Sequence, residues 1–206
     1  MILIRHGETP FNVAFRETRR DPGVVDPGLT PEGRDQVAAA GRVLAGEAGD
    51  RRPARLVASP YRRTLESATI LADILDVPVS VEPLVRERSV FACDIGTPAS
   101  VLAREWRHLA LDHLDEIWWA AAEESEEALD RRSHRFHRAM TAAPDWSRLC
   151  IVSHWGFIRS LTGQGLENAE THRLAAGHIH PRAPALEAGR DEASMHGGCQ
   201  ATLRES

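Results

Sequence analysis

Three short apolar runs set the strongest limits on how this chain can fold. They cover residues 2–4, 56–58 and 150–152, and each is a continuous run rather than an alternation with polar residues. Continuous aliphatic runs of this length are typical of strands that are buried on both faces of a sheet. Helical patterns lie between the runs. Strands that alternate with helices predict an α/β fold around a mostly parallel sheet.

Two segments between the runs carry clear helix starts. Thr30 followed by Pro31 is typical of an N-cap and a first helical residue, and apolar residues then recur at helical spacing as far as Gly46. Ser59 followed by Pro60 offers the same chemistry before an apolar face that continues to residue 75. We therefore expect one helix to begin at each of these two pairs.

The second half of the chain carries weaker signals. Residues 98–143 look helical, because Leu129, Phe136 and Met140 fall on one helical face. The remaining expectations are a weak strand at residues 79–81, a further helix after Gly156, and a tail from Thr171 that is irregular apart from a stray strand.

The composition narrows the classes of function. The chain has 206 residues, 42% of them hydrophobic, which suits one globular domain. Its net charge of -5 gives no sign of a nucleic-acid partner or an anionic membrane surface. All 25 basic residues are arginines, which excludes a lysine Schiff base and a P-loop lysine.

The cysteines and the amino terminus indicate the cellular setting. Cys93, Cys150 and Cys199 are odd in number and widely spaced, so we expect neither a disulfide framework nor a structural zinc site. The apolar run at residues 2–4 is too short for a signal peptide, and no later run is long enough to cross a bilayer. These features predict a cytoplasmic protein.

Basic side chains and histidines follow all three runs. The first run leads into Arg5 and His6, the second into Arg63, and the third into His154. Ligands of parallel sheets bind beyond the carboxyl ends of the strands, so we expect these side chains to meet at one edge. Helices that begin there add free backbone N–H groups. The sequence therefore predicts a pocket for a small dianion, most simply a phosphoryl group.

The same residues resemble a known family in their order along most of the chain. The motif Arg5-His6-Gly7-Glu8-Thr9, followed by Asn12, resembles the signature of the histidine phosphatase superfamily, in its phosphoglycerate mutase-like branch. Further similar segments are Leu29-Thr30-Pro31-Glu32-Gly33 with Gln36, Ser59-Pro60 with Arg63 and Ser67-Ala68, Leu84-Val85-Arg86-Glu87, and Val152-Ser153-His154.

This resemblance implies a role for each site residue. His6 would attack phosphorus as a neutral imidazole. Arg5, Arg63 and His154 would stabilise the phosphoryl oxygens. Glu87 would protonate the leaving oxygen and then activate water, which calls for a pKa raised by burial. Substrate contacts are expected from Gly7, Thr9, Asn12 and Trp155.

The chain also departs from the family pattern. Phe11 and Trp155 replace residues that are often tryptophan and glycine, and Trp155 would narrow the mouth of the pocket. Residues 91–96 are one residue longer than expected beyond Glu87. Counted from Ser59, the second arginine of the motif is Arg63, so Arg62 is expected to point elsewhere.

Several functions remain open at this stage. The segment from Glu87 to His154 is short for a mutase, which favours phosphomonoester hydrolysis over phosphoglycerate mutase-type transfer. A phospho-ligand-binding module without catalysis is disfavoured, because the nucleophile, the acid and both arginines are present. His178 and His180 form an HxH pair without a partner at recognisable metal-ligand spacing, so we expect a polar tail rather than a metal site.

The predicted architecture is a three-layer α/β/α sandwich. One catalytic domain would span residues 1–206, with a helical cap insertion at about 97–127 and an irregular tail at about 171–206. No cofactor is expected, and the partner is a small phosphorylated substrate of open identity. The sequence gives no oligomeric state. Two outer groups have alternative interpretations. The loop with Arg16, Arg19 and Arg20 is a solvated charged turn or contacts a second anionic group, and Trp118 and Trp119 pack in the core or a lid or line the outer pocket.

Overall fold

The structure is a computed structural model, and it describes residues 1–175 and 177. Its centre is a sheet of five strands in the order β3-β2-β4-β1-β5. β1 to β4 are parallel, and β5 pairs antiparallel with β1 at one edge. The strands are β1 Ile2–Arg5, β2 Arg55–Ala58, β3 Val79–Val81, β4 Leu149–Ser153 and β5 Thr171–Arg173.

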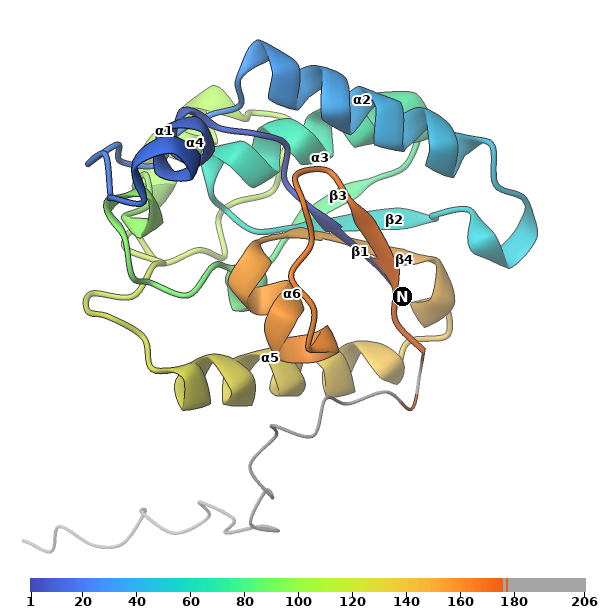
Figure 1. The fold of residues 1–206 in the computed structure, drawn as a ribbon. Helices are drawn as coiled ribbons and strands as arrows, with labels where there is room; N and C mark the ends of the chain where they lie inside the picture. Colours follow the sequence, from blue (N-terminus) through green and yellow to red (C-terminus); the bar gives the residue numbers. More distant parts are fainter. Residues whose placement is uncertain (176, 178–206) are drawn as a thin grey trace, which may run out of the picture.

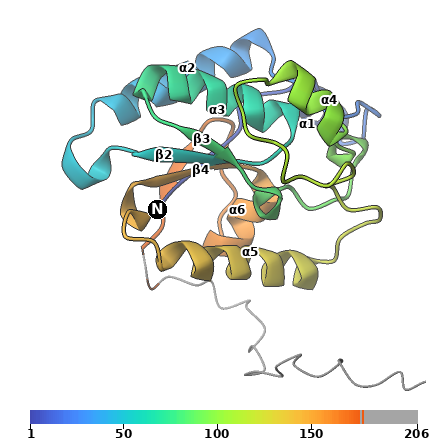
Figure 2. The same ribbon diagram turned by 180° about the vertical axis from the view of Figure 1, so that it is seen from behind.

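Helices cover both faces of the sheet. Figures 1 and 2 show α2 and α3 on one face and α5 and α6 on the other, so the expected three-layer fold is confirmed. No helix in the described part of the chain has the length and apolar character of a membrane span. The helices are α1 Pro10–Thr18, α2 Pro31–Ala45, α3 Arg62–Leu75, α4 Ala99–Glu105, α5 Glu126–Thr141 and α6 Trp155–Thr162.

Two hydrophobic clusters explain why the three runs at residues 2–4, 56–58 and 150–152 are apolar at every position. In β1, Ile2 and Ile4 belong to the cluster under α2 and α3, whereas Leu3 belongs to the cluster under α5 and α6. In β4, Cys150 and Ile151 divide between the clusters in the same way. Successive side chains of a strand point to opposite faces, so a sheet covered on both sides requires continuous apolar runs.

The expected start of the first long helix is confirmed. Thr30 caps α2 by accepting a hydrogen bond from the backbone N–H of Gly33, and Pro31 is the first helical residue. α3 begins later than expected, with Tyr61 as its N-cap and Arg62 as its first residue. The reason is that the hydroxyl of Ser59 lies against His154 and does not cap the helix.

The expected helix over residues 98–143 is wrong in its middle. α4 ends at Glu105, and α5 begins only after Ser125, which caps it by accepting from the N–H of Ala128. Between these helices the chain is irregular, and it buries Leu111 and Trp118 against the core. Within α5 the buried face includes Leu129 and Phe136, as the helical spacing predicts.

The sequence interpretation missed α1, which follows β1 directly. Thr9 and Asn12 form a reciprocal capping box at its start, and Pro10 is its first residue. Arg16 therefore lies on a helix rather than in a loop, and Arg19 ends that helix in the left-handed conformation with φ of 56°. The short 3₁₀ helices are η1 Gly49–Arg51, η2 Pro83–Val85, η3 Ala92–Asp94 and η4 Trp146–Arg148.

The tail is described only at its beginning. The stray strand expected after Thr171 is present as β5. The pair His178 and His180, together with Cys199, lies outside the described residues.

Candidate active site

The carboxyl ends of β1 and β4 bring two histidines together. The parallel register pairs Arg5 with Ser153, so His6 and His154 follow side by side. Their ring centroids lie 5.2 Å apart with the planes tilted by 59°. The convergence expected from the three runs is therefore present in the structure.

His6 is buried, and one hydrogen bond fixes its ring. The Nδ1 atom lies 2.8 Å from the carbonyl oxygen of Gly7. A carbonyl only accepts, so Nδ1 carries the proton and the lone pair of a neutral ring is on Nε2. Burial lowers the pKa of His6 well below its usual value, and the charges of Arg63 and Arg5 lower it further. The ring is therefore a neutral imidazole with a free Nε2 lone pair.

The loop that carries His6 is packed closely against the start of α2. A side chain on Gly7 would place its Cβ 2.2 Å from the carbonyl oxygen of Gly33, which no real contact allows. The N–H of Gly7 also donates to the hydroxyl of Ser67 on α3 over 3.2 Å. Two helices thus hold the backbone beside His6 in place.

Arg63 and His154 form one buried unit. The Nε of Arg63 donates to Nδ1 of His154 over 3.2 Å, and the other ring nitrogen lies 2.9 Å from the hydroxyl of Ser59. Asp94 accepts from the far side of the same guanidinium at 3.1 Å, and these two side chains are 4% and 1% exposed. Burial lowers the pKa of His154 well below its usual value, with Arg63 adding to the shift.

Arg5 and Asn12 present donors to the same space. One terminal nitrogen of Arg5 donates to the carbonyl of Leu166 over 2.8 Å, while its buried Nε has no partner among the described residues. Asn12 uses its carbonyl oxygen to accept from Thr9 and from Asn168. Within the described part of the chain its amide nitrogen is therefore free to donate to a ligand.

Glu87 lines the cavity beside the start of α6. Its two carboxylate oxygens accept from the backbone N–H groups of Arg88 at 2.9 Å and Gly156 at 3.1 Å. Dense surrounding protein raises the pKa of Glu87, and the neighbouring charge of Asp94 raises it further. The direction of this shift is the one expected for a general acid.

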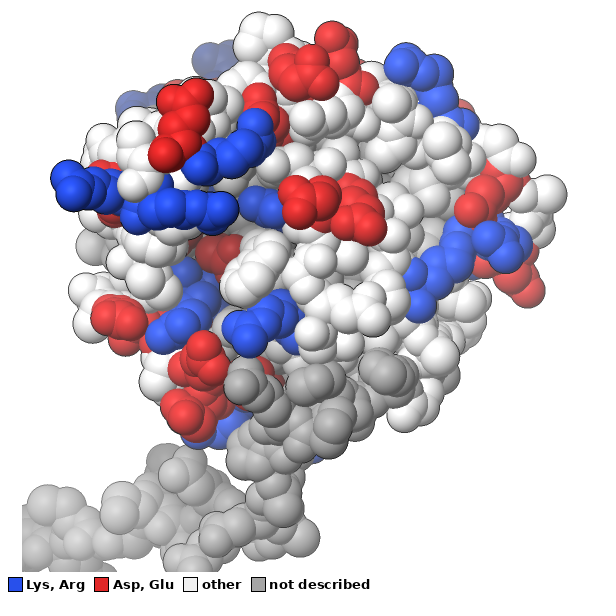
Figure 3. Space-filling model, viewed as in Figure 1, with Lys and Arg blue, Asp and Glu red and all other residues white. Residues whose placement is uncertain are grey.

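These groups surround a cavity of about 570 Å³. Figure 3 shows arginine side chains around a recess on the side of the molecule where α1 lies in Figure 1. Gly7 and His154 are not among the residues that line this cavity, and His154 is fully buried. The predicted site residues that line the cavity are Arg5, His6, Thr9, Asn12, Arg63, Glu87 and Trp155.

An aromatic wall forms another side of the cavity. The rings of Phe11, Phe15 and Phe91 lie 5.3 to 5.4 Å from one another, centroid to centroid. Phe15 was missed because α1 was missed, and Phe91 was not assigned a role because residues 91–96 are one residue longer than the family pattern. Asp94 escaped for the second reason, and Asn168 had no signal because it lies in an irregular loop.

The segment expected to cap the site lies elsewhere. Residues 97–127 contribute nothing to the lining of the cavity, whereas Arg88, Val90, Phe91, Cys93 and Asp94 do. Trp118 is buried with its ring 4.6 Å from that of Tyr61, and its indole N–H donates to Thr97, so it is a core residue. Arg62 points away from the site, as expected, and pairs with Glu105.

The arginines near α1 divide between two environments. Arg16 forms an ion pair with Glu8 at 2.7 Å, whereas Arg19 lines the cavity. Within residues 1–175 and 177, no three His, Cys, Asp or Glu side chains are grouped as they would be to hold a metal ion.

Comparison with known proteins agrees with this geometry. The model of the histidine phosphatase superfamily (branch 1) matches residues 1–183. A glucosyl-3-phosphoglycerate phosphatase from Mycolicibacterium vanbaalenii is 30% identical over 178 residues, which cover 79% of this chain and 72% of that protein. A probable phosphoglycerate mutase, GpmB of Erwinia tasmaniensis, is 30% identical over 74% of this chain and 67% of its own length.

A solved structure supports the same family and fold. A mycobacterial glucosyl-3-phosphoglycerate phosphatase in complex with VO3 superposes with a TM-score of 0.59 and 25% identity, covering 83% of this chain and 88% of that one. The enzyme class and the fold expected from the sequence are confirmed by these matches. The chain belongs to the histidine phosphatase superfamily, branch 1.

Proposed function

We propose that this protein hydrolyses phosphomonoesters through a phosphohistidine on His6. The observation that carries the proposal is the hydrogen bond from Nδ1 of His6 to the carbonyl of Gly7. It leaves the Nε2 lone pair as a nucleophile, and the lowered pKa keeps the ring neutral. The adjacent guanidinium groups of Arg5 and Arg63 suit a phosphoryl dianion.

In the first step, Nε2 of His6 attacks phosphorus and the bond from phosphorus to the leaving oxygen breaks. Glu87 gives its proton to that oxygen, so the alcohol leaves neutral. Arg5, Arg63 and the amide of Asn12 hold the phosphoryl oxygens as charge builds on them. His154 accepts from Nε of Arg63 through its Nδ1, so it stays neutral and fixes the guanidinium that binds these oxygens.

In the second step, water attacks the phosphohistidine. The ionised carboxylate of Glu87 takes a proton from this water, the bond from phosphorus to Nε2 breaks, and inorganic phosphate leaves. The two steps return His6 and Glu87 to their starting states. The proposal therefore requires no cofactor.

The aromatic wall favours hydrolysis over mutase-type transfer. A mutase must retain a bisphosphorylated intermediate, which needs a second group of cations away from His6. Phe11, Phe15 and Phe91 line the cavity instead. Arg88 is already paired with Glu123 and Glu126, which leaves Arg19 as the one further arginine that the described residues contribute to the lining beside Arg5 and Arg63. Transfer back to a phosphoglycerate is the second candidate, supported by the mutase among the relatives.

The setting proposed for this activity is the cytoplasm. Cys93 and Cys150 are both free and buried, which suits a reducing compartment. The substrate would be a small phosphate ester, as it is by name for the glucosyl-3-phosphoglycerate phosphatases among the relatives.

The proposal is tested with 4-nitrophenyl phosphate in the presence of a chelator. Wild type should turn over and His6→Ala should not, with a loss of roughly 10⁴-fold or more. His108 is exposed on the surface, so His108→Ala is the matched control and should keep full activity. A phosphoryl group that remains on the protein after rapid quenching, and that is lost in acid but stable in alkali, would identify the phosphohistidine. Equal rates in wild type and His6→Ala would refute it.

A further inference from the structure

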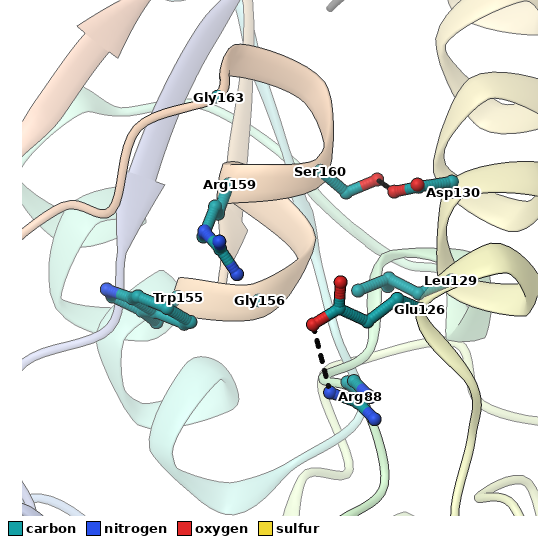
Figure 4. Close-up of a pocket in the computed structure, with 9 residues that line it drawn as sticks. All are labelled: Arg88, Glu126, Leu129, Asp130, Trp155, Gly156, Arg159, Ser160 and Gly163. Atoms are coloured by element: carbon teal, nitrogen blue, oxygen red, sulfur yellow. Dashed lines mark hydrogen bonds and ion pairs between the residues drawn. The ribbon is translucent and has the colours of Figure 1, made fainter. Parts of the chain in front are cut away.

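A second cavity adjoins the active-site cavity on the far side of Trp155. Its volume is about 270 Å³, and it lies between α5 and α6 (Figure 4). Arg88, Trp155 and Gly156 line both cavities, so the start of α6 is the boundary between them. We refer to the smaller space as the side cavity. Its other lining residues are Glu126, Leu129, Asp130, Arg159, Ser160 and Gly163.

The charges that line the side cavity balance each other. Arg88 pairs with Glu126 over 3.5 Å, and Asp130 accepts a 2.5 Å hydrogen bond from the hydroxyl of Ser160. Two guanidinium groups thus face two carboxylates. Arg88 is offset by Glu126, and the lining as a whole carries as many carboxylates as guanidinium groups, so a second anion would gain little net attraction there. The lining suits a neutral group that both donates and accepts hydrogen bonds.

Arg159 supplies unused donors on one wall. Its guanidinium carbon lies 5.2 Å from the centroid of the Trp155 ring. No group in the described part of the chain accepts a hydrogen bond from this guanidinium. Figure 4 shows Arg159 between Trp155 and Ser160, beside the cavity. Trp155 itself is 44% exposed, so its ring offers an apolar surface to a ligand in either cavity.

We propose that the side cavity binds a neutral, polyhydroxylated group of the substrate, such as a sugar ring, while the phosphate lies against His6. Hydroxyl groups can accept from Arg159 and donate to Glu126, and the C–H surface of a sugar can pack on Trp155. Sites for complete small molecules measure about 300–1,000 Å³, so this space fits one ring of a larger ligand. The inference rests on the proposed function and narrows its substrates to phosphate esters of sugars and similar polyols.

The test compares two phosphate esters in two variants. We would measure kcat/KM for glucose 6-phosphate and for 4-nitrophenyl phosphate with wild type, Arg159→Leu and Glu126→Gln. Each variant should lose about tenfold on the sugar ester, the loss expected for a hydrogen bond to a charged group, and stay within about twofold on the aryl ester. Arg138→Leu, an exposed change on α5, is the matched control and should alter neither value.

Two outcomes would overturn the inference and leave the proposed function intact. One is an equal effect of Arg159→Leu on both esters. The other is a wild type that turns over the aryl ester and none of a panel of hexose 1- and 6-phosphates.

If no turnover is seen, a binding measurement separates the side-cavity proposal from the proposed hydrolysis. Glucose 6-phosphate would be titrated calorimetrically into His6→Ala and into His6→Ala/Arg159→Leu. Binding that weakens about tenfold in the double variant would support the side cavity even if hydrolysis failed. Identical binding in both proteins would overturn it.

Discussion

The Nε of Arg63 donates to Nδ1 of His154 over 3.2 Å, and this contact decides how the second histidine is protonated. A guanidinium always donates, so Nδ1 of His154 must be the acceptor and its proton must be on Nε2. The same arginine donates to Asp94 from its other end. The orientation of Arg63, and through it of the neutral His154, therefore depends on one buried carboxylate.

Asp94 is expected to act as a positioning residue for Arg63. Asp94→Asn keeps the shape but removes the charge, so Arg63 would be buried with a weaker partner. Breaking a buried ion pair costs about 3–5 kcal/mol of stability when one charge remains alone, and the retained amide should hold the cost to the lower part of that range. We expect a lower free energy of unfolding and a fall in kcat of roughly 10²-fold, measured by denaturant titration and steady-state kinetics.

Exposed Asp112 gives the control for this change. Asp112→Asn should leave stability and kcat unchanged. A structural role alone would lower the stability of Asp94→Asn without lowering kcat in the folded protein, and that result would contradict the positioning role.

Glu87→Gln should slow the release of poor leaving groups most. The amide cannot give a proton to the leaving oxygen, and a positioned general acid contributes typically 10²- to 10⁴-fold. A series of aryl and alkyl phosphates would show a steeper dependence of kcat/KM on the pKa of the leaving alcohol. Glu32→Gln, an exposed change at the start of α2, should match wild type. An unchanged slope in Glu87→Gln would assign the acid to another residue.

Much of the fold could be predicted because the sheet is covered on both faces. That burial makes β1, β2 and β4 continuous apolar runs, and the residues after them then fall at one edge. The family and the convergence of His6, Arg63 and His154 follow from the same pattern. Local chemistry also located α2, through Thr30 and Pro31.

The misses have physical causes. α1 begins at the capping box of Thr9 and Asn12, a short signal that spans four residues, and the helix itself has only nine residues. Residues 106–125 have an irregular backbone that buries Leu111 and Trp118. The spacing of buried residues in this segment therefore follows neither the helical nor the strand period. Asp94 contacts Arg63 from the short 3₁₀ helix η3 and does not follow a buried strand, so the strand-end pattern that located His6 and His154 could not locate it.

The pH dependence of kcat/KM should reflect two shifts of opposite sign. His6 must be neutral and Glu87 protonated at the start of the reaction. With the ordinary pKa values of 6.5 and 4.5, only about one molecule in a hundred would hold both states at any pH. Burial lowers the pKa of His6 and raises that of Glu87, which enlarges this fraction.

The profile should therefore be bell-shaped. kcat/KM rises as pH passes the lowered pKa of His6, because the imidazole loses its proton, and falls as pH passes the raised pKa of Glu87. Rates for 4-nitrophenyl phosphate, corrected for ionisation of the ester, would give both limbs. Glu87→Gln should lose the alkaline limb and keep the acid one. Retention of both limbs would contradict the assignment of Glu87.

Arg132 is expected to hold the segment that carries Glu87. From α5 its guanidinium donates to the carbonyls of Leu84, Arg86 and Glu87 and forms a buried ion pair with Glu124 at 2.5 Å. Arg132→Met would leave these acceptors without their donor and Glu124 with only a long contact to Arg86. Losing one partner of a buried pair costs about 3–5 kcal/mol, so we expect a clear fall in Tm.

The matched change Arg135→Met lies on the exposed face of α5 and should shift stability by no more than about 0.5 kcal/mol. The same loss of Arg132 should reduce kcat, because the backbone that aims Glu87 at the leaving oxygen is no longer fixed. Since Glu87 acts on the leaving group, this reduction should be larger for alkyl than for aryl phosphates. A fall in Tm with equal kinetic effects on both esters would mean that Arg132 supports the fold without orienting the acid.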